Sequence, residues 1–590
     1  MVGLKKTAVA FLKDNYLIIS ILGLGLLIRL WGVANDLPMI STVADESLMI
    51  FPSIGMLARH SFIPEATLGT YFPFLHYVYI VAFLPHIFWL FIVNGFSFLA
   101  VEKSIIFDLS GLTLMARLSS ILMGTATIWL IYAISLKIFK RQLPAYLAAL
   151  FFALDPLNVA LSHVARVWGP QTFFIYLSLY FSLRYFGDQD QKVKVRGYLI
   201  TAIFILLSIG VNPPGIFAYF LWLIIIAVYR FNLDWKKYFK FLFSKPSIFF
   251  HGILLLGGAA ILSLASGSLI LLYKDAYSVF FDAGSSAVIS GHTVTRSVLP
   301  LWQKILLSFN TFWQYESVAI ILFIPALFLI FRKDKKLFFF LSLSFLVFFI
   351  CLNPPLINFV RARYLATMMP FIVLPAAWLS AEIFLRLKNK NFLLALIFIG
   401  LIAAPALFLD LRNDYLLARS SSNLDLYYWL KDNLKADERA FIFGNYLSQD
   451  LLPSRELLAQ IKKSAPDYYS ARFKYLSDNK SGDWAGYNLY SEGFLCRFSP
   501  EQIKQLKFKY LIISENSDLE INLAEFKICG LIPVDLFNSN PVFIRDTAPF
   551  YKYSLTDSYY IDGNLFAESY KPLLSIKQFG PRIRVYQINQ

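Results

Sequence analysis

Apolar segments of nearly membrane-spanning length recur along the first two thirds of the chain. Between residues 16 and 410 most of them approach the ~20 residues that an α-helix needs to cross a bilayer, with short polar interruptions between them. Of all 590 residues, 57% are hydrophobic and 16% are charged, whereas soluble domains carry about 25% charged residues. The pattern predicts a mostly α-helical integral membrane protein, a polytopic bundle that is multi-pass in the cell membrane.

Basic residues gather in the short loops between these segments. The clusters lie at 137–141, 184–196, 236–245, 332–336 and 386–390. Lysine and arginine accumulate in cytoplasmic loops of membrane proteins, so the clusters mark the cytoplasmic side. The formal net charge of +16 therefore reflects topology, and we expect no nucleic-acid partner.

The loop clusters fix the expected order of spans. Spans are predicted at 16–34, 114–138, 143–163, 169–186, 198–212, 214–231, 247–273, 316–331, 337–353, 363–386 and 391–410. The apolar run within 71–112 either lies in the membrane interface or crosses and returns, which gives 11 or 13 spans. Either odd number places the tail outside the cytoplasm.

The chain therefore divides into a transmembrane domain, 1–410, and an extracytoplasmic domain, 411–590. The first outer loop is expected at 35–113. In the tail, residues 424–433 have the spacing of an amphipathic helix, and 440–443, 510–513 and 582–588 have the pattern of short strands. A small α/β domain is expected there. Three cysteines are too few for a disulfide framework.

An adjacent pair of carboxylates, Asp45 and Glu46, follows the first span by about a dozen residues. Carboxylates at the edge of a bilayer are costly unless they bind something, so they indicate a functional site. The alternative is a pair of solvated loop residues.

Arginines on the outer side run against the usual charge bias. Arg166 lies at the outer end of one span, and Arg361 and Arg363 lie at the start of another. The guanidinium fork of donors suits a phosphate group. Contacts with lipid headgroups or with loop carboxylates are the alternatives for each arginine taken singly.

Other polar residues on the outer side are candidates for substrate contacts. They are His163, one helical turn from Arg166, with Tyr71 and His76, whereas Tyr364, next to Arg363, is a further candidate for the phosphate site. No spacing of histidines and carboxylates supports a metal site, so a divalent cation stays open. The chain lacks the glycine-rich loops that bind nucleotides. A phosphate site facing outward would therefore need a substrate carried by a lipid.

Several motifs, in this order, resemble the GT-C superfamily of integral membrane glycosyltransferases. The resemblance is closest to the branch of protein O-mannosyltransferases and the aminoarabinose transferase of lipid A, and it extends over residues 20–380. Its motifs are Arg29-Leu30, Asp45-Glu46, Tyr71-x-Pro-x-Leu75, Ala116-Arg-Leu-Ser119, Phe139-Lys-Arg141, Pro156 to His163, and Arg363-Tyr364 with Pro370.

The resemblance implies a GT-C fold and a reaction. Asp45 would be the catalytic general base with Glu46 beside it, and an inverting transfer would move a sugar from a polyprenyl-phosphate donor to an acceptor hydroxyl. The acceptor would be a glycan, a lipid or a protein at the outer face. Many relatives have an aspartate after the Ser-His position, where this chain has Trp168-Gly169, which argues against a two-aspartate site. The oligosaccharyltransferase signature Trp-Trp-Asp-Tyr-Gly is absent.

The rival class is a transporter or flippase for a lipid-linked sugar, or a non-catalytic membrane scaffold. Transporters often have broken helices at mid-membrane, and Asn212-Pro-Pro-Gly215 is a candidate break. The unusual polar residues gather at outer span ends instead, which favours the enzyme.

Overall fold

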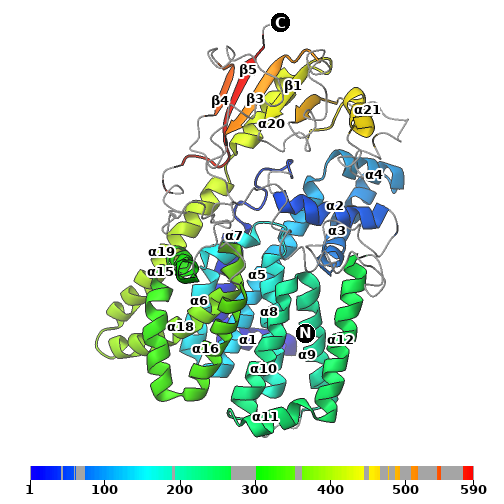
Figure 1. Ribbon diagram of the computed structural model, residues 1–590. Helices are drawn as coiled ribbons and strands as arrows, with labels where there is room; N and C mark the ends of the chain where they lie inside the picture. Colours follow the sequence, from blue (N-terminus) through cyan, green and yellow to red (C-terminus); the bar gives the residue numbers. More distant parts are fainter. Residues whose placement is uncertain are drawn as a thin grey trace.

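A bundle of long helices carries a small sheet domain at one end (Figure 1). The structure is a computed structural model, and the residues it describes are 2–40, 44–58, 60, 74–188, 193–266, 301–352, 362–443, 451–464, 476, 486–491, 506–515, 541–545, 574 and 576–588. The architecture confirms the expected fold class, a mostly α-helical membrane bundle followed by a small domain that contains a sheet.

Most of each predicted span is helical in the described residues. The helices of the bundle are α1 (Val2–Leu30), α2 (Ala44–Ala58), α3 (Phe74–Val93), α4 (Phe98–Phe107), α5 (Ser110–Phe139), α6 (Gln142–Ala153), α7 (Pro156–Ser162), α8 (Trp168–Phe186), α9 (Val195–Val211), α10 (Phe217–Ile225), α11 (Trp235–Leu242), α12 (Lys245–Ser266), α15 (Leu301–Lys333), α16 (Lys335–Leu352), α17 (Ala362–Leu365), α18 (Met369–Lys388) and α19 (Phe392–Leu417). Short 3-10 helices η1 (Pro213–Ile216) and η4 (Ala366–Met368) and the π-helix η2 (Ile226–Arg230) adjoin α10 and α17. By length and hydropathy, four helices of the described chain are able to cross a membrane, or six if each of two bent pairs counts as one span.

The predicted span 143–163 is broken rather than continuous. Helices α6 and α7 meet at a bend of 56°. Pro156 has no N–H and begins α7, where proline is favoured. The Asp155 carboxylate caps the new helix by accepting bonds from the N–H groups of Leu157 (3.0 Å) and Asn158 (3.2 Å). Helix α7 thus begins in a new direction at its Asp155 cap, and His163 is the residue that follows its last turn.

The apolar run after residue 71 consists of helix α3 and the shorter helix α4. Gly95 and Phe96, both with φ of 61°, form the tight turn between them. Helices α2, α3 and α4 gather at the end of the bundle next to the sheet domain (Figure 1).

Aromatic packing holds together α8, α9, α10 and α12. The fully buried Trp222 ring lies 4.3 Å from the Phe250 ring and 5.6 Å from the Phe186 ring, centroid to centroid. Phe186 also packs edge-on against Tyr198 of α9 at 5.1 Å. Because lipid is as apolar as these side chains, close packing rather than transfer out of water stabilises such contacts.

The sheet domain is built from β1 (Arg439–Phe443), β2 (Asn488–Ser491), β3 (Tyr510–Glu515), β4 (Phe543–Arg545) and β5 (Arg582–Gln587), with α20 (Ser422–Asn433) and α21 (Arg455–Ser464). The strand order is β2-β1-β3-β5-β4. Strands β1, β2 and β3 are parallel, and β5 is antiparallel to β3 and β4. Apolar residues of α20 and α21 cover the sheet in two separate clusters. The predicted helix 424–433 and strands 440–443, 510–513 and 582–588 are all present.

The segment before β5 contacts both α19 and α20, and Arg412 of α19 donates from Nη2 to the Ile576 carbonyl at 2.5 Å. The Ser422 N–H donates to the Phe579 carbonyl at 2.9 Å, and its hydroxyl donates to the Pro581 carbonyl at 2.7 Å. Gly580, at φ +112°, lies between these acceptors, and a Cβ there would come within 2.1 Å of the Ser422 Oγ. From the bundle, Met39 is buried in the same cluster as Leu426 of α20. The segment after α1 is therefore covered by the sheet domain.

Replacing Trp222 by alanine should destabilise the bundle, because the cavity left among α8, α10 and α12 loses packing contacts. We expect a loss of about 3 kcal/mol, in the range of large-to-small core substitutions, measured by thermal unfolding in detergent. Trp129→Ala is the matched control, since that ring is 43% exposed and should change the unfolding temperature little. Equal shifts for the two variants would contradict the packing described here.

Candidate functional site

A buried ion pair between Glu46 of α2 and Arg117 of α5 lies where the first outer loop was expected. The Glu46 carboxylate receives two parallel bonds from Arg117, from Nε at 2.8 Å and from Nη2 at 2.7 Å. The two residues are 0% and 1% exposed. This bidentate arrangement is the strong form of the arginine–carboxylate pair.

The same pair binds backbone groups of two further segments. Arg117 Nη1 donates to the carbonyls of Val33 (2.9 Å) and Asn35 (2.7 Å). Glu46 Oε1 accepts a bond from the Ala165 N–H at 2.7 Å. Buried charges are tolerated when hydrogen bonds complete their shells, and here those bonds join the end of α1, the start of α2 and the turn between α7 and α8.

The pair locates the backbone of Asp45, which precedes Glu46 in the first turn of α2. The Asp45 side chain lies outside the described part of the structure. Glu46 was paired with Asp45 on sequence grounds as a catalytic residue, and its carboxylate binds Arg117 and Ala165. That partner set holds the start of α2 against the turn that leads to Arg166.

Two of the predicted phosphate-binding arginines are buried near this turn. Arg166 follows Ala165 directly and is buried, as is Arg363. The Arg363 Cζ lies 6.0 Å from the centroid of the Trp168 ring, within the range of a cation–π contact. The structure thus brings Glu46, Arg166 and Arg363 to one region, although they are far apart in the sequence.

Hydrogen bonds hold the segment after Arg363 against α7 and α8. The Tyr176 hydroxyl donates to the Thr367 carbonyl at 2.8 Å, and Asn158 Nδ2 donates to the Ala366 carbonyl at 3.4 Å. The position of Arg363 relative to the α7–α8 turn therefore depends on contacts between helices rather than on a free loop.

The histidines predicted to contact substrate are both buried and hydrogen-bonded. His163 Nε2 lies 2.9 Å from the Trp31 carbonyl, and Nδ1 lies 2.9 Å from the Val159 carbonyl. His76 Nδ1 lies 3.1 Å from both the Ser53 hydroxyl and the Met49 carbonyl, so it joins α3 to α2. Both rings connect elements around the site.

Tyr71 and Arg361 lie outside the described residues, as does the side chain of Tyr364. These three positions therefore stay predictions from the sequence.

Sequence reasoning did not bring together a cluster of buried charged residues that lies next to α7. Arg29 is fully buried and donates from Nη1 to the carbonyls of Gly25 and Ala153, both at 3.0 Å. Its guanidinium lies close enough to three buried carboxylates for charge attraction, those of Asp155, Asp410 and Asp414. Within the described chain, the Asp410 oxygens have no hydrogen-bond partner. A charged residue inside a span was the available signal, but Asp410 and Asp414 lie at the predicted span end, where they pass for solvated residues.

No three metal-ligating side chains of the described chain are grouped so as to hold an ion. The divalent cation left open by the sequence therefore gains no residues from the structure.

A family model matches a quarter of the chain. Residues 104–249, which include Arg117 and the α7–α8 turn, match the model described as dolichyl-phosphate-mannose-protein mannosyltransferase. The match confirms the resemblance to the GT-C superfamily of membrane glycosyltransferases. No curated protein matches the chain.

Solved structures of GT-C enzymes are similar to this chain at low identity. ArnT from Cupriavidus metallidurans bound to undecaprenyl phosphate is 12% identical, with a TM-score of 0.49, over 87% of this chain and 95% of that one. The oligosaccharyltransferase of Archaeoglobus fulgidus, in a complex with Zn and sulfate, is 13% identical, with a TM-score of 0.42, over 84% of this chain and 68% of that one.

Arg117→Met should strongly destabilise the protein, because it leaves the Glu46 carboxylate buried without its partner. We expect a loss of about 3–5 kcal/mol, measured by thermal unfolding in detergent, and partial recovery when Glu46→Gln is added. The control is Arg141→Met, whose partner Glu382 is shared and partly exposed. It should cost less than about 1 kcal/mol. An unfolding temperature of Arg117→Met equal to that of the wild type would show that the pair does not stabilise the start of α2.

Proposed function

We propose that this protein is a membrane glycosyltransferase that moves a sugar from a polyprenyl-phosphate donor to an acceptor hydroxyl at the outer face of the membrane. The observation that supports this function most directly is the Glu46–Arg117 pair, because it fixes the start of α2, with Asp45 in its first turn, against the turn that carries Arg166. In this proposal acid and fixed positive charge meet at the end of the bundle next to the sheet domain.

In this proposal Asp45 is the general base. Its carboxylate takes the proton from the acceptor hydroxyl as that oxygen attacks the anomeric carbon of the sugar. The bond from that carbon to the phosphate oxygen breaks, and the electron pair leaves with the polyprenyl phosphate. Because attack comes from the face opposite the leaving group, the sugar's configuration inverts.

Arg166 and Arg363 are the phosphate-binding residues of the proposal. Each guanidinium stays charged at any physiological pH and presents several donors. Their burial strengthens the attraction to a phosphate, since the local dielectric constant is lower than that of water. Negative charge that grows on the departing phosphate would be stabilised in place. Arg361 and Tyr364 are further candidates for the same contact.

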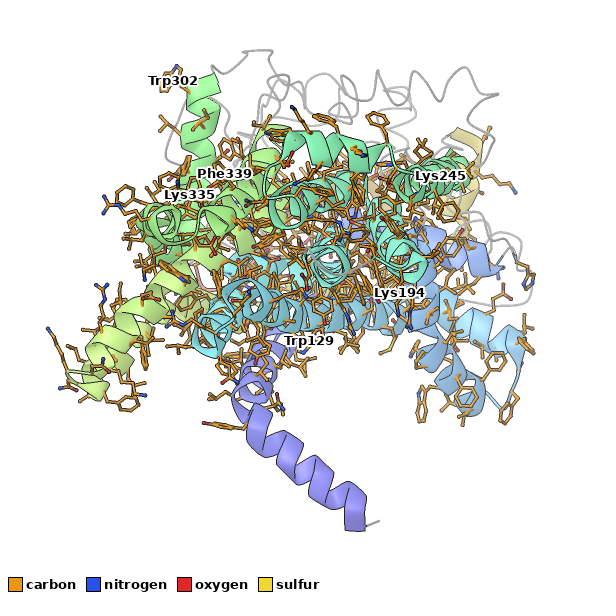
Figure 2. All side chains as sticks on the ribbon, turned by 90° about the horizontal axis from the view of Figure 1, so that it is seen from below. Trp129, Lys194, Lys245, Trp302, Lys335 and Phe339 are labelled. Carbon is orange, nitrogen blue, oxygen red and sulfur yellow. The ribbon has the colours of Figure 1, made fainter. Side chains whose placement is uncertain are left out.

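The charge distribution supports the outer location. The basic loops near residues 194, 245 and 335 lie at the bundle end opposite the sheet domain (Figure 1), and Figure 2, which views the molecule from that end, labels Lys194, Lys245 and Lys335. By the positive-inside rule this end is cytoplasmic. The site and the sheet domain then face outward, where the acceptor, a glycan, lipid or protein, would be met.

Asp45→Asn should abolish sugar transfer without loss of the lipid site. We expect a fall of roughly 10²- to 10⁴-fold in transfer, measured by mass spectrometry of cell-envelope glycans in cells that carry the variant as their only copy. Undecaprenyl phosphate should still bind the purified variant. Glu102→Gln is the control, since that carboxylate is exposed on neighbouring α4. Full transfer by Asp45→Asn would favour the transporter or scaffold instead.

Arg363→Gln should weaken binding of undecaprenyl phosphate to the purified protein by about 10-fold or more, because it removes a charge-assisted hydrogen bond to the phosphate. Binding is measured by native mass spectrometry in detergent. Arg184→Gln, at an exposed arginine of α8, should bind like the wild type. Unchanged affinity in Arg363→Gln would remove this residue from the phosphate site.

A further inference from the structure

Helix α11 lies across the end of the bundle that is opposite the sheet domain (Figure 1). It spans Trp235–Leu242 between α10 and α12 and meets α12 at a bend of 60°. Its sequence, from Trp235, is Trp-Lys-Lys-Tyr-Phe-Lys-Phe-Leu. Aromatic and basic residues thus make up almost all of this helix, which is bent away from the axis of α12.

The helix is fixed to the bundle at its start and along one side. The Asp234 carboxylate caps it by accepting a bond from the Lys237 N–H at 3.2 Å. Tyr238 is buried against the core, and the Phe241 ring lies 5.3 Å from Phe231. The turn before it has two consecutive residues with positive φ, Asn232 (51°) and Leu233 (63°), so its direction is set by the backbone.

The rest of the helix surface divides into an apolar part and a basic part. At about 100° per residue, the exposed rings of Trp235, Phe239 and Phe243 fall on one side of the bundle-facing residues. They are 55%, 53% and 76% exposed. Lys236, Lys240 and Lys237 follow further round, all exposed. Going round the helix, one meets the bundle, then bare aromatic rings, then ammonium groups.

This order of sides matches the layers of a membrane interface. Aromatic rings such as that of tryptophan favour the boundary between hydrocarbon and headgroups. Lysines on an amphipathic helix reach anionic headgroups, each contributing about 1 kcal/mol near the surface. Lys237 is paired with Asp234 at 3.2 Å, whereas Lys236 and Lys240 have no ion pair among the described residues. Two ammonium groups are thus available to phosphates.

We propose that α11 is an interfacial helix that binds anionic phospholipid headgroups in the cytoplasmic leaflet. The exposed rings enter the hydrocarbon boundary, and Lys236 and Lys240 contact the lipid phosphates, with Lys245 at the start of α12 nearby. We infer a lipid rather than a soluble anion as the ligand, because the lysines lie next to exposed aromatic rings that would contact lipid chains. Bound lipid would set the depth of α10 and α12 in the membrane.

The test uses the purified full chain and dioleoylphosphatidylglycerol, with bound lipid measured by native mass spectrometry. The variant Lys236→Gln with Lys240→Gln should bind this lipid roughly 10- to 30-fold more weakly, with an unchanged unfolding temperature. The matched control, Lys388→Gln with Lys390→Gln, removes two exposed lysines at the end of α18 and just after it and should bind like the wild type. Trp235→Ala with Phe239→Ala should weaken binding of phosphatidylglycerol and phosphatidylcholine together.

Three outcomes would overturn the proposal. Wild-type affinity in the Lys236–Lys240 variant would exclude these lysines, and would leave a protein partner for the helix. An equal loss of lipid binding in the Lys388–Lys390 control would show that the effect comes from the overall charge of the protein. Full competition by inorganic phosphate at equal concentration would show that the ligand of these lysines is a soluble anion and not a lipid.

Discussion

The arrangement of the candidate site depends on one ion pair in which neither partner has access to water. Glu46 and Arg117 are 71 positions apart, and each would be strongly destabilising if buried alone. Together they satisfy one another and take in the backbone at Val33, Asn35 and Ala165. Because the pair binds all these segments, the start of α2 has a fixed position against the α7–α8 turn. A site assembled from loops thereby gains the rigidity of the helices beneath it.

A second layer of buried polarity lies behind this pair. The Asp155 cap turns the chain at the α6–α7 break, and Arg29 donates to the carbonyl of Ala153, at the end of α6. Asp414 of α19 lies 3.5 Å from His163 Nε2, and α20 follows α19 into the sheet domain. The α7–α8 turn near the proposed transfer site therefore contacts α19, the helix that leads into the sheet domain.

The sequence predicted the helices and strands, but it did not predict which charged residues pair across the fold. Spans follow from the length of apolar runs, and strands such as 510–513 follow from β-branched and aromatic composition, because both signals are local. The partner of Glu46 is not local, and Arg117 was noted only as part of a family motif. Asp410 and Asp414 look like solvated residues at the end of a span, and only the packing of α19 buries them. The break at Pro156 was missed because a proline near the end of an apolar run is compatible with a continuous span.

The account rests on the claim that Asp45 and the buried arginines face one lipid phosphate. An experimental structure of the full chain in a lipid nanodisc with undecaprenyl phosphate measures this directly. We expect the phosphate within hydrogen-bond distance, about 3 Å, of Arg166 or Arg363, with the Asp45 carboxylate turned toward the same cavity. A phosphate bound elsewhere in the bundle, with Asp45 facing away from it, would contradict the proposed chemistry.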